Sequence, residues 1–298
     1  MKIGIDVGGS HIAVGLVNEK GKIIKKTEKD LKQKENIKED IVNYVDNSIH
    51  ELSKNADITK IGIAAPGNPN GAKIYHIVNL GIEELDFSII EQKYGIRIKS
   101  INDAKAAGLA EKQYGAMYGY KDEVFLCLGT GIGGAVFLNN QLLQANKNSG
   151  FELGHIVIEK DGIQCNCGKK GCFETYCSIK RFKENISKEL NKINYHLEIE
   201  NSANLIQEIE KYKQESNIQK LINQYINDLI IGLSNIIDIF EPEIIVLGGS
   251  FVYFKEIIYT KLLEEMEKRK YVFNKNSLPK IELAQLGNDA GIIGATLI

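Results

Sequence analysis

The chain alternates short apolar runs with longer stretches in which apolar residues recur every three or four positions. The short runs have the length of buried strands and lie at residues 2–7, 13–17, 23–24, 61–65, 97–101 and 244–247. The longer stretches have helical spacing and lie at residues 37–52, 104–114, 178–194, 204–212 and 218–240, with a last short helix ending at residue 298. Pro242 ends the longest stretch, because proline cannot continue a helix. The pattern predicts an α/β protein, with a charged strand edge and helix start at residues 25–40 and a loop at residues 68–71.

One strand-turn-strand segment occurs twice, because residues 5–18 overlay residues 126–139 with Gly8 on Gly129. Small residues at each turn leave backbone amides open to an oxyanion. The repeat therefore predicts two similar domains that face a cleft and hold a polyphosphate between their turns. The halves are not equivalent, because Asp6 ends the first strand and Cys127 stands at the matching place.

The second turn continues as Gly-Thr-Gly-Ile-Gly-Gly over residues 129–134, which has the look of a dinucleotide-binding fingerprint. That fingerprint requires a helix after the glycines. Residues 135–138 are strand-like, so we reject the dinucleotide interpretation. Gly248 and Gly249 follow another predicted strand, where they either let a ligand approach or only separate the strand from the next helix.

Three cysteines and one histidine have the spacing of a metal site. Cys165, Cys167 and Cys172 share one short loop, and His155 precedes it. A set of three thiolates and one imidazole closes a tetrahedral zinc site of the structural kind, with no open position. Two glycines inside the loop suit its tight curvature. The alternatives are a chance cluster of reduced thiols and a disulfide, which are less typical of such a cluster in the cytoplasm.

Polar residues flank these motifs. Glu152 and Glu174 lie on either side of the metal ligands, where they suit a polyhydroxylated ligand together with the second ring nitrogen of His155. The alternative is that both are ordinary surface glutamates.

Asn102 and Asp103 follow a predicted strand and begin a helix, so the alternative for them is helix capping, which accounts for only one of the two.

Composition narrows the partners. At 298 residues, the chain is long enough for two domains, and its 37 Lys and Arg against 39 Asp and Glu give a net charge of -2. This balance argues against nucleic acid or an anionic membrane as the main partner and favours small metabolites. The chain has no apolar stretch of membrane-spanning length, and five cysteines do not form an even secreted framework. We expect a cytoplasmic protein, with no DNA-binding segment before the first strand.

Several motifs follow one another along the chain, namely Asp-Val-Gly-Gly-Ser at 6–10, Pro-Gly at 66–67, Asn-Asp-Ala at 102–104, Gly-Thr-Gly-Ile-Gly-Gly at 129–134, Glu-Leu-Gly-His at 152–155, the cysteine loop at 165–172 with Glu174, and Leu-Gly-Gly at 247–249. Taken together in this order, they resemble the ROK family of bacterial sugar kinases. Val-Asn-Leu-Gly at 78–81 and Leu-Gly-Asn-Asp-Ala-Gly at 286–291 are most similar to bacterial glucokinases. The resemblance implies the actin-like ATPase (ribonuclease H-like) fold, with one α/β domain at residues 1–104 plus about 287–298 and a second at 105–286.

The resemblance also implies ATP-dependent phosphorylation of a hexose with Mg²⁺, a structural Zn²⁺ and a homodimer. Asp103 would be the base on the sugar hydroxyl, and His155, Cys165, Cys167 and Cys172 would bind the zinc. The sugar would be held by Gly67, Asn68, Asn102, Asp103, Glu152, His155 and Glu174. The nucleotide and its metal would be held by Asp6, Gly8, Gly9, Ser10, Gly129, Thr130, Gly131, Gly133, Gly134, Gly248 and Gly249.

Four positions depart from the family pattern. Ser10 replaces the usual Thr, His11 stands where Lys or Thr is frequent, Phe151 replaces a Gly, and Ile82 replaces a frequent Trp. The last two flank the expected sugar site, so they leave the sugar open. We rank glucose first, with N-acetylmannosamine, mannose, fructose and allose behind it. The main alternative is a sugar-sensing regulator without catalysis, because an actin-like filament or chaperone would not need the cysteine loop.

Overall fold

The computed structural model describes residues 1–31, 36–54, 56–145, 150–193, 201–269 and 278–298. Residues 32–35 of the predicted charged run and Asn194 of a predicted helix lie outside this part of the chain. The described chain forms two compact units. The first holds Met1–Gly119, Gln144–Gly150 and Gln285–Ile298, and the second holds Tyr120–Leu143 and Phe151–Ala284.

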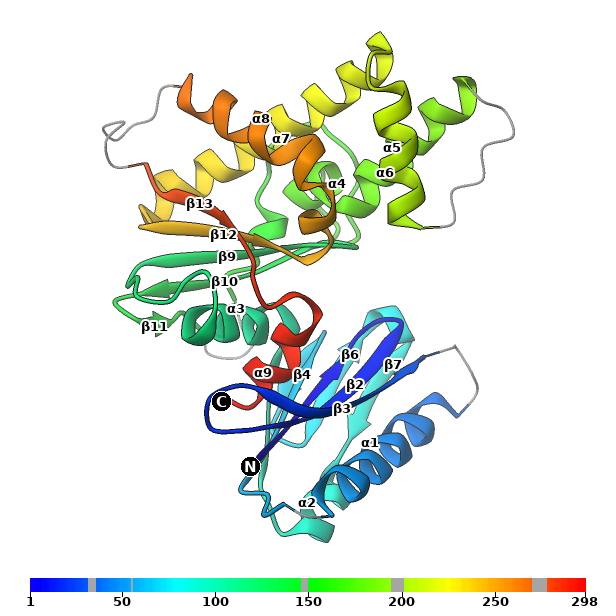
Figure 1. Cartoon of the computed structure of the whole chain (residues 1–298), viewed down its shortest axis with the longest axis vertical. Coiled ribbons are helices and arrows are strands. Elements are labelled where there is room, and N and C mark those ends of the chain that lie inside the picture. The colour runs from blue at the N-terminus through cyan, green and yellow to red at the C-terminus, as the bar shows by residue number, and fades with distance from the viewer. Residues whose placement is uncertain (32–35, 55, 146–149, 194–200, 270–277) are drawn as a thin grey trace. The chain divides into compact units, whose positions relative to one another are not determined.

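The first unit is built on a five-stranded sheet in the order β3-β2-β1-β4-β8 (Figure 1). Its strands are β1 (Lys2–Val7), β2 (His11–Val17), β3 (Ile23–Asp30), β4 (Lys60–Ala65) and β8 (Ile98–Asn102). β1, β2 and β3 form an antiparallel meander, whereas β4 pairs parallel with both β1 and β8. The carboxyl ends of β1, β4 and β8 therefore lie along one edge of the sheet.

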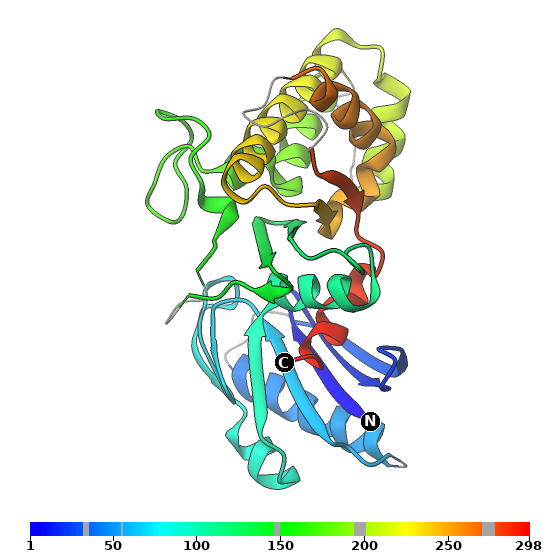
Figure 2. The ribbon, with the colours of Figure 1, turned by 90° about the vertical axis from the view of Figure 1, so that its left-hand side faces the viewer.

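Strand alternation assigns the two faces of this sheet. Ile3 and Ile5 point into a core that they share with Ile41, Val45 and Ile49 of α1 (Ile37–Ser53). The intervening positions face α9 (Ala290–Ala295), which lies against β1 and β4 (Figure 2).

Two of these intervening positions are glycines, because the backbone of α9 comes very close. A Cβ added at Gly4 would be 2.0 Å from the carbonyl oxygen of Ile292, and one at Gly62 would be 1.7 Å from that of Ala295. Any larger side chain at either position would push the helix off the sheet.

The helix α3 (Asp103–Tyr114) packs on α9 in the first unit. The buried carboxylate of Glu111 on α3 accepts hydrogen bonds from the amides of Gln285 and Leu286, both at 2.8 Å, and from that of Ala116 at 2.9 Å. These bonds hold α3 together with the returning C-terminal segment. The contacts thus place α3 in the first unit, whereas the sequence analysis drew its boundary at residue 104.

A second, three-stranded sheet completes the first unit, with β5 (Asn68–Asn70), β6 (Lys73–Ile77) and β7 (Ile82–Asp86) followed by α2 (Ser88–Tyr94). The predicted loop at residues 68–71 was wrong for its first three residues. The sequence Asn-Pro-Asn shows no apolar alternation, and proline is tolerated here because β5 is an edge strand. Ile82 is buried in the core, so its side chain serves packing.

The second unit repeats the topology of the first, with a five-stranded sheet in the order β11-β10-β9-β12-β13. Its strands are β9 (Glu123–Leu128), β10 (Ile132–Leu138), β11 (Gln141–Leu142), β12 (Ile244–Gly248) and β13 (Lys280–Leu283). β9, β10 and β11 are antiparallel, and β12 lies parallel between β9 and β13. The predicted repeat is confirmed, because the hairpin β9-β10 matches β1-β2 strand for strand.

Helices cover the five-stranded sheet of the second unit. They are α4 (Phe173–Cys177), α5 (Ile179–Ile193), α6 (Ser202–Tyr212), α7 (Ser216–Phe240) and α8 (Lys255–Glu267). The predicted long helix is confirmed as α7, which ends before Pro242 with Glu241 in a left-handed conformation (φ 43°). Gly232 lets α7 approach α4, since a Cβ there would be 2.3 Å from the ring of Phe173. In the part of the chain that the structure describes, no helix has the length and apolar character needed to cross a membrane.

Candidate functional site

In the first unit, the predicted site residues gather where three parallel strands end. Asp6 lies beside Ala64 in the register of β1 and β4, and Ala65 lies beside Asn102 in that of β4 and β8. Gly67 follows β4 by two residues, and Asp103 follows β8 directly. The carboxyl ends of parallel strands are the usual place for ligands in α/β sheets.

The two residues at the end of β8 have separate tasks. The side chain of Asn102 caps α3, because its Oδ1 accepts a hydrogen bond from the amide of Lys105 at 3.3 Å. The capping alternative is therefore confirmed for Asn102. Asp103 Oδ1 accepts from the adjacent amide of Ala104 at 2.8 Å, and burial raises the pKa of the Asp103 carboxyl above its ordinary value. Asp103 is thus a carboxylate with raised proton affinity at the first turn of a helix.

Asp6 is the second carboxyl group at this edge. Burial, and next the negative charge of Asp103, raise the pKa of Asp6 to about 7. Gly291 permits this position, since a Cβ there would be 2.3 Å from an oxygen of the Asp6 carboxyl. Two carboxyl groups that disfavour each other's charge are suited to proton transfer or to binding a cation between them and a ligand.

We expect Asp6→Asn to stabilise the protein increasingly as the pH rises from 5 to 8. A carboxyl whose pKa is higher in the folded than in the unfolded chain is destabilising once it ionises, so the wild type loses stability over this range up to the folded pKa near 7. The difference in unfolding free energy should reach about 2–4 kcal/mol at pH 8 and be smaller at pH 5. Urea unfolding of both proteins at the two pH values measures it. A difference that does not change with pH would show that Asp6 is charged throughout.

The remaining predicted residues of the first unit lie in loops or on the edge strand β5. Gly67 has φ 86°, and a Cβ on it would be 2.4 Å from the carbonyl oxygen of Tyr75, so only glycine fits there. Asn68 is an exposed residue of β5. Gly8, Gly9 and Ser10 form the turn between β1 and β2, which the bond from the amide of Gly8 to the carbonyl of His11 closes at 2.8 Å.

In the second unit, two glycine segments meet at the ends of β9 and β12. Gly248 is the register partner of Cys127, and a Cβ on Gly249 would be 2.7 Å from the carbonyl oxygen of Leu128. The turn between β9 and β10 begins directly after Leu128 and contains the exposed residue Thr130. The predicted nucleotide residues of this unit thus lie at one sheet edge, with Gly129, Gly131, Gly133 and Gly134 in and after the turn.

The predicted metal ligands of the second unit are brought together. One ligand atom from each of His155, Cys165, Cys167 and Cys172 lies within 4.8 Å of all the others. The Sγ atoms of Cys167 and Cys172 are 3.5 Å apart, and Sγ of Cys165 is 3.7 Å from Nδ1 of His155. Thiolates bound tetrahedrally at about 2.3 Å from a zinc ion are about 3.8 Å apart, so the four residues fit a tetrahedral ion.

The backbone of the cysteine loop supports this geometry. Gly168 (φ 90°) and Gly171 (φ 74°) both adopt the left-handed conformation, as their place in the loop predicted. The amide of Lys169 donates to the Cys167 sulfur and lowers the pKa of that thiol. Cys167 therefore favours the thiolate form that binds a metal ion, whereas burial raises the pKa of the Cys165 thiol to about 12 and also raises that of Cys172. A bound ion would have to displace the protons of these two thiols.

Glu174 joins the cysteine loop to the glycine turn. Its Oε1 accepts from the thiol of Cys165 at 3.3 Å and lies 3.5 Å from Nδ1 of His155, while its Oε2 accepts from the amide of Ile132 at 3.4 Å. Gly131 makes room for it, since a Cβ there would be 2.5 Å from Oε2. From the sequence alone we expect Glu174 just outside the ligands, and no motif indicates these contacts.

Glu152 differs from Glu174. Its carboxylate is exposed and, within the ranges that the structure describes, makes no hydrogen bond or ion pair. This position fits both interpretations of Glu152, as an ordinary surface glutamate and as a hydrogen-bond acceptor for a ligand.

Lys105, a residue that no motif singled out, contacts the segment before Glu152. Lys105 on α3 is 1% exposed, and its Nζ donates to the carbonyl oxygen of Gly150 at 2.9 Å. A lysine between two alanines on a buried helix face was the available signal, because a buried ammonium group needs partners. Phe151 has φ 54°, a conformation that costs about 1–2 kcal/mol for a residue with a side chain. The chain therefore keeps at this position the backbone that suits the glycine usual there.

Known proteins resemble this chain along almost its whole length. A model of the ROK family matches residues 2–298. The chain is 34% identical to a glucokinase of Thermotoga maritima, over 99% of this chain and 96% of that protein. It is 27% identical to a xylose repressor of Bacillus subtilis, over 99% of this chain and 76% of the repressor.

A solved structure shows the same fold. The crystal structure of a ROK family glucokinase from Streptomyces griseus, in complex with glucose and AMPPNP, superposes with a TM-score of 0.77. The sequences are 24% identical, and the match covers 99% of this chain and 97% of that one. The chain has the two-domain actin-like ATPase fold, as the resemblance to the family implied.

Proposed function

The chain belongs to the ROK family, and we propose that it is an ATP-dependent sugar kinase that phosphorylates a hexose, with glucose as the first candidate. The observation that carries the proposal is the Asp103 carboxylate, which stands at the end of β8 with its pKa raised by burial. Phosphoryl transfer needs one carboxylate to accept the proton of the attacking hydroxyl, and otherwise needs positioning and charge stabilisation.

In this proposal Asp103 takes the proton from the hydroxyl on carbon 6 of the sugar. The backbone at Gly67 and the side chains of Asn68 and Asn102 position the ring from the first unit. Asn102 can do so only with its remaining hydrogen-bonding groups, because Oδ1 already accepts from the amide of Lys105. The proposal assigns Glu152, His155 and Glu174 to the same sugar.

ATP and Mg²⁺ are the implied cosubstrate and metal. The amides of the two glycine turns, at residues 8–10 and 129–131, would bind phosphate oxygens, and Gly248 and Gly249 would leave room for the nucleoside. Asp6 would help to hold Mg²⁺ and its water ligands, since carboxylates are the ligands that Mg²⁺ prefers. A bound cation would also offset the burial and the repulsion by Asp103 that raise the pKa of Asp6.

We further propose that the cysteine cluster holds one structural Zn²⁺ and that the protein is a homodimer. The donor set supports zinc, because three sulfurs and one imidazole nitrogen leave no open position. The homodimer is proposed because members of the family commonly form dimers and because the second unit has apolar helices. Light scattering at micromolar protein concentration measures the oligomeric state.

A non-catalytic sugar sensor is the second candidate, because the chain is similar to a xylose repressor along 99% of its length. A sensor needs the sugar-binding residues but no base. The presence of a carboxyl at position 103 with raised proton affinity favours the kinase.

We expect ADP release in a coupled assay with ATP, Mg²⁺ and a panel of glucose, mannose, fructose, allose, N-acetylmannosamine and N-acetylglucosamine. Glucose should give the largest kcat/KM. If one of the N-acetylated sugars is the best substrate, the kinase proposal stands and the choice of glucose is wrong. If no sugar releases ADP although calorimetry shows that a sugar binds, the protein is a sensor.

A further inference from the structure

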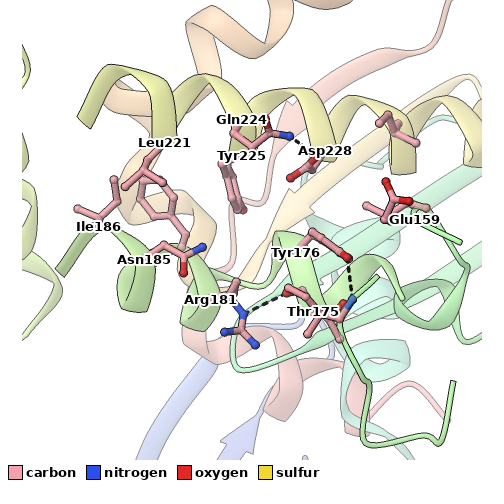
Figure 3. Close-up of a pocket in the computed structure, with 14 residues that line it drawn as sticks. Glu159, Thr175, Tyr176, Arg181, Asn185, Ile186, Leu221, Gln224, Tyr225 and Asp228 are labelled. Carbon is pink, nitrogen blue, oxygen red and sulfur yellow. Dashed lines mark hydrogen bonds between the residues drawn. The ribbon is translucent and has the colours of Figure 1, made fainter. Parts of the chain in front are cut away.

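A pocket in the second unit lies apart from the residues assigned above. Its volume is about 350 Å³, which is within the size range of small-molecule sites. Its walls come from α4, α5, α7 and the segment before the cysteine loop (Figure 3). The apolar part of the wall includes Ile158, Ile163, Phe182, Ile186, Leu221 and Tyr225.

Two carboxylates line the same pocket, Asp228 from α7 and Glu159 from the segment before the cysteine loop (Figure 3). Asp228 Oδ1 accepts from Nε2 of Gln224 at 2.8 Å. Within the described chain, the carboxylate of Glu159 has neither a hydrogen bond nor an ion pair. Asp228 and Glu159 interact electrostatically. Burial is the largest cause of the raised pKa of Asp228, and the negative charge of Glu159 raises it further.

Among the described residues that line the pocket, Arg181 is the one cationic side chain, and it is already engaged. Nε of Arg181 donates to the carbonyl oxygen of Thr175 at 3.1 Å, and its Nη1 pairs with Glu184 at 3.3 Å. Arg181 therefore does not neutralise Asp228 and Glu159. The pocket thus combines an apolar wall with two carboxylates for which the described part of the chain provides no cationic partner.

We propose that this pocket binds a small organic ammonium compound with an apolar body. The ammonium group would lie between Asp228 and Glu159, and the body would lie against α5 and α7. An anionic ligand would face two negative charges, and a neutral apolar ligand would remove water from the carboxylates without replacing its hydrogen bonds. An ammonium group satisfies both carboxylates with charge-assisted hydrogen bonds.

The sharpest test compares three probes that share a phenyl-alkyl body, namely 2-phenylethylammonium, 2-phenylethanol and 3-phenylpropionate. Binding is followed by thermal shift and isothermal calorimetry on the full chain. We expect the ammonium probe alone to raise the Tm, with a Kd of about 1 mM or lower, as its size allows. Equal effects of all three probes would overturn the proposal, because the carboxylates would then play no part.

Substitutions place the bound probe. Asp228→Asn and Glu159→Gln should each weaken binding of the ammonium probe about 10-fold or more, since each removes a charge-assisted contact. Asp238→Asn is the matched control, because Asp238 is an exposed aspartate on the same helix outside the pocket. Glu159 is exposed, so Glu159→Gln keeps the test decisive if Asp228→Asn fails to fold. Unchanged affinity in both variants would contradict the proposal.

A second copy of the chain is the competing occupant of this face, because Ile163 and Ile231 in its lining are 41% and 38% exposed. Ile231→Lys distinguishes the two. If the pocket takes an ammonium compound, this variant keeps the oligomeric state of the wild type in light scattering. If it dissociates an oligomer and no probe binds the wild type, the face is a subunit interface and the proposal is wrong.

Discussion

Asp103→Asn should reduce the turnover of the best sugar about 10²–10⁴-fold while changing the dissociation constant of that sugar far less. Asparagine has the same size and can still accept the hydrogen bond that Asp103 Oδ1 receives from the amide of Ala104 at 2.8 Å. It cannot accept the proton of the attacking hydroxyl. The loss should therefore lie in kcat, measured by ADP release, and calorimetry should show that sugar still binds.

The control for Asp103→Asn lies one residue earlier. Asn102→Ala removes the cap that Asn102 provides to α3, so it should lower stability by about 1 kcal/mol, and any catalytic loss should appear mainly in sugar affinity. The two variants thus separate a base from a capping or positioning residue. If Asp103→Asn keeps near-normal turnover, or loses it only because sugar no longer binds, the assignment of Asp103 as the base is wrong.

The pH dependence of kcat/KM tests the role of the Asp103 carboxyl independently. A base must be ionised, and burial raises the pKa of Asp103, so kcat/KM should fall as the pH drops through that raised pKa. Burial and the charge of Asp103 raise the pKa of Asp6 to about 7, so the acidic limb of the profile belongs to the pair of carboxyl groups. A profile that is flat down to pH 5 would contradict an essential carboxyl of raised pKa.

The sheet cores and the repeat could be predicted from sequence because they depend on local patterns. The apolar runs that became β1, β4 and β12 lie inside their sheets and are largely buried, and the repeat indicated β9 through its match to β1. The edge strands β5 and β13 carry polar residues and proline, so no pattern marked them. Their pairing is decided by neighbours distant in the sequence.

The site residues were identified by motif, but their contacts were not. Nothing in the sequence indicated that the carboxylate of Glu174 reaches both the cysteine cluster and the amide of Ile132, because that contact depends on how α4 packs beside the glycine turn. Lys105 was missed for a related reason. Its carbonyl partner Gly150 is distant along the chain, and only the fold brings the two together.

Removal of zinc should have the other large effect, which is loss of order in the cysteine loop. Few buried apolar groups of its own hold this loop in place. Zinc in small structural sites contributes about 10–16 kcal/mol to the folding of its ligands. Protein purified without added zinc should contain about one equivalent by elemental analysis. Less than about a tenth of an equivalent in a protein whose loop stays ordered would contradict the zinc assignment.

Cys165→Ser tests whether the metal also positions the sugar site. Serine removes a ligand beside Glu174 and His155, so we expect loss of zinc and sugar affinity lower by about 10–100-fold. Cys177→Ser is the matched control, since Cys177 is a buried free cysteine at the end of α4 and lies outside the cluster. It should keep its zinc and its sugar affinity even where it lowers stability. If both variants lose sugar affinity equally, the effect comes from general destabilisation of α4, and the metal does not position Glu174 and His155.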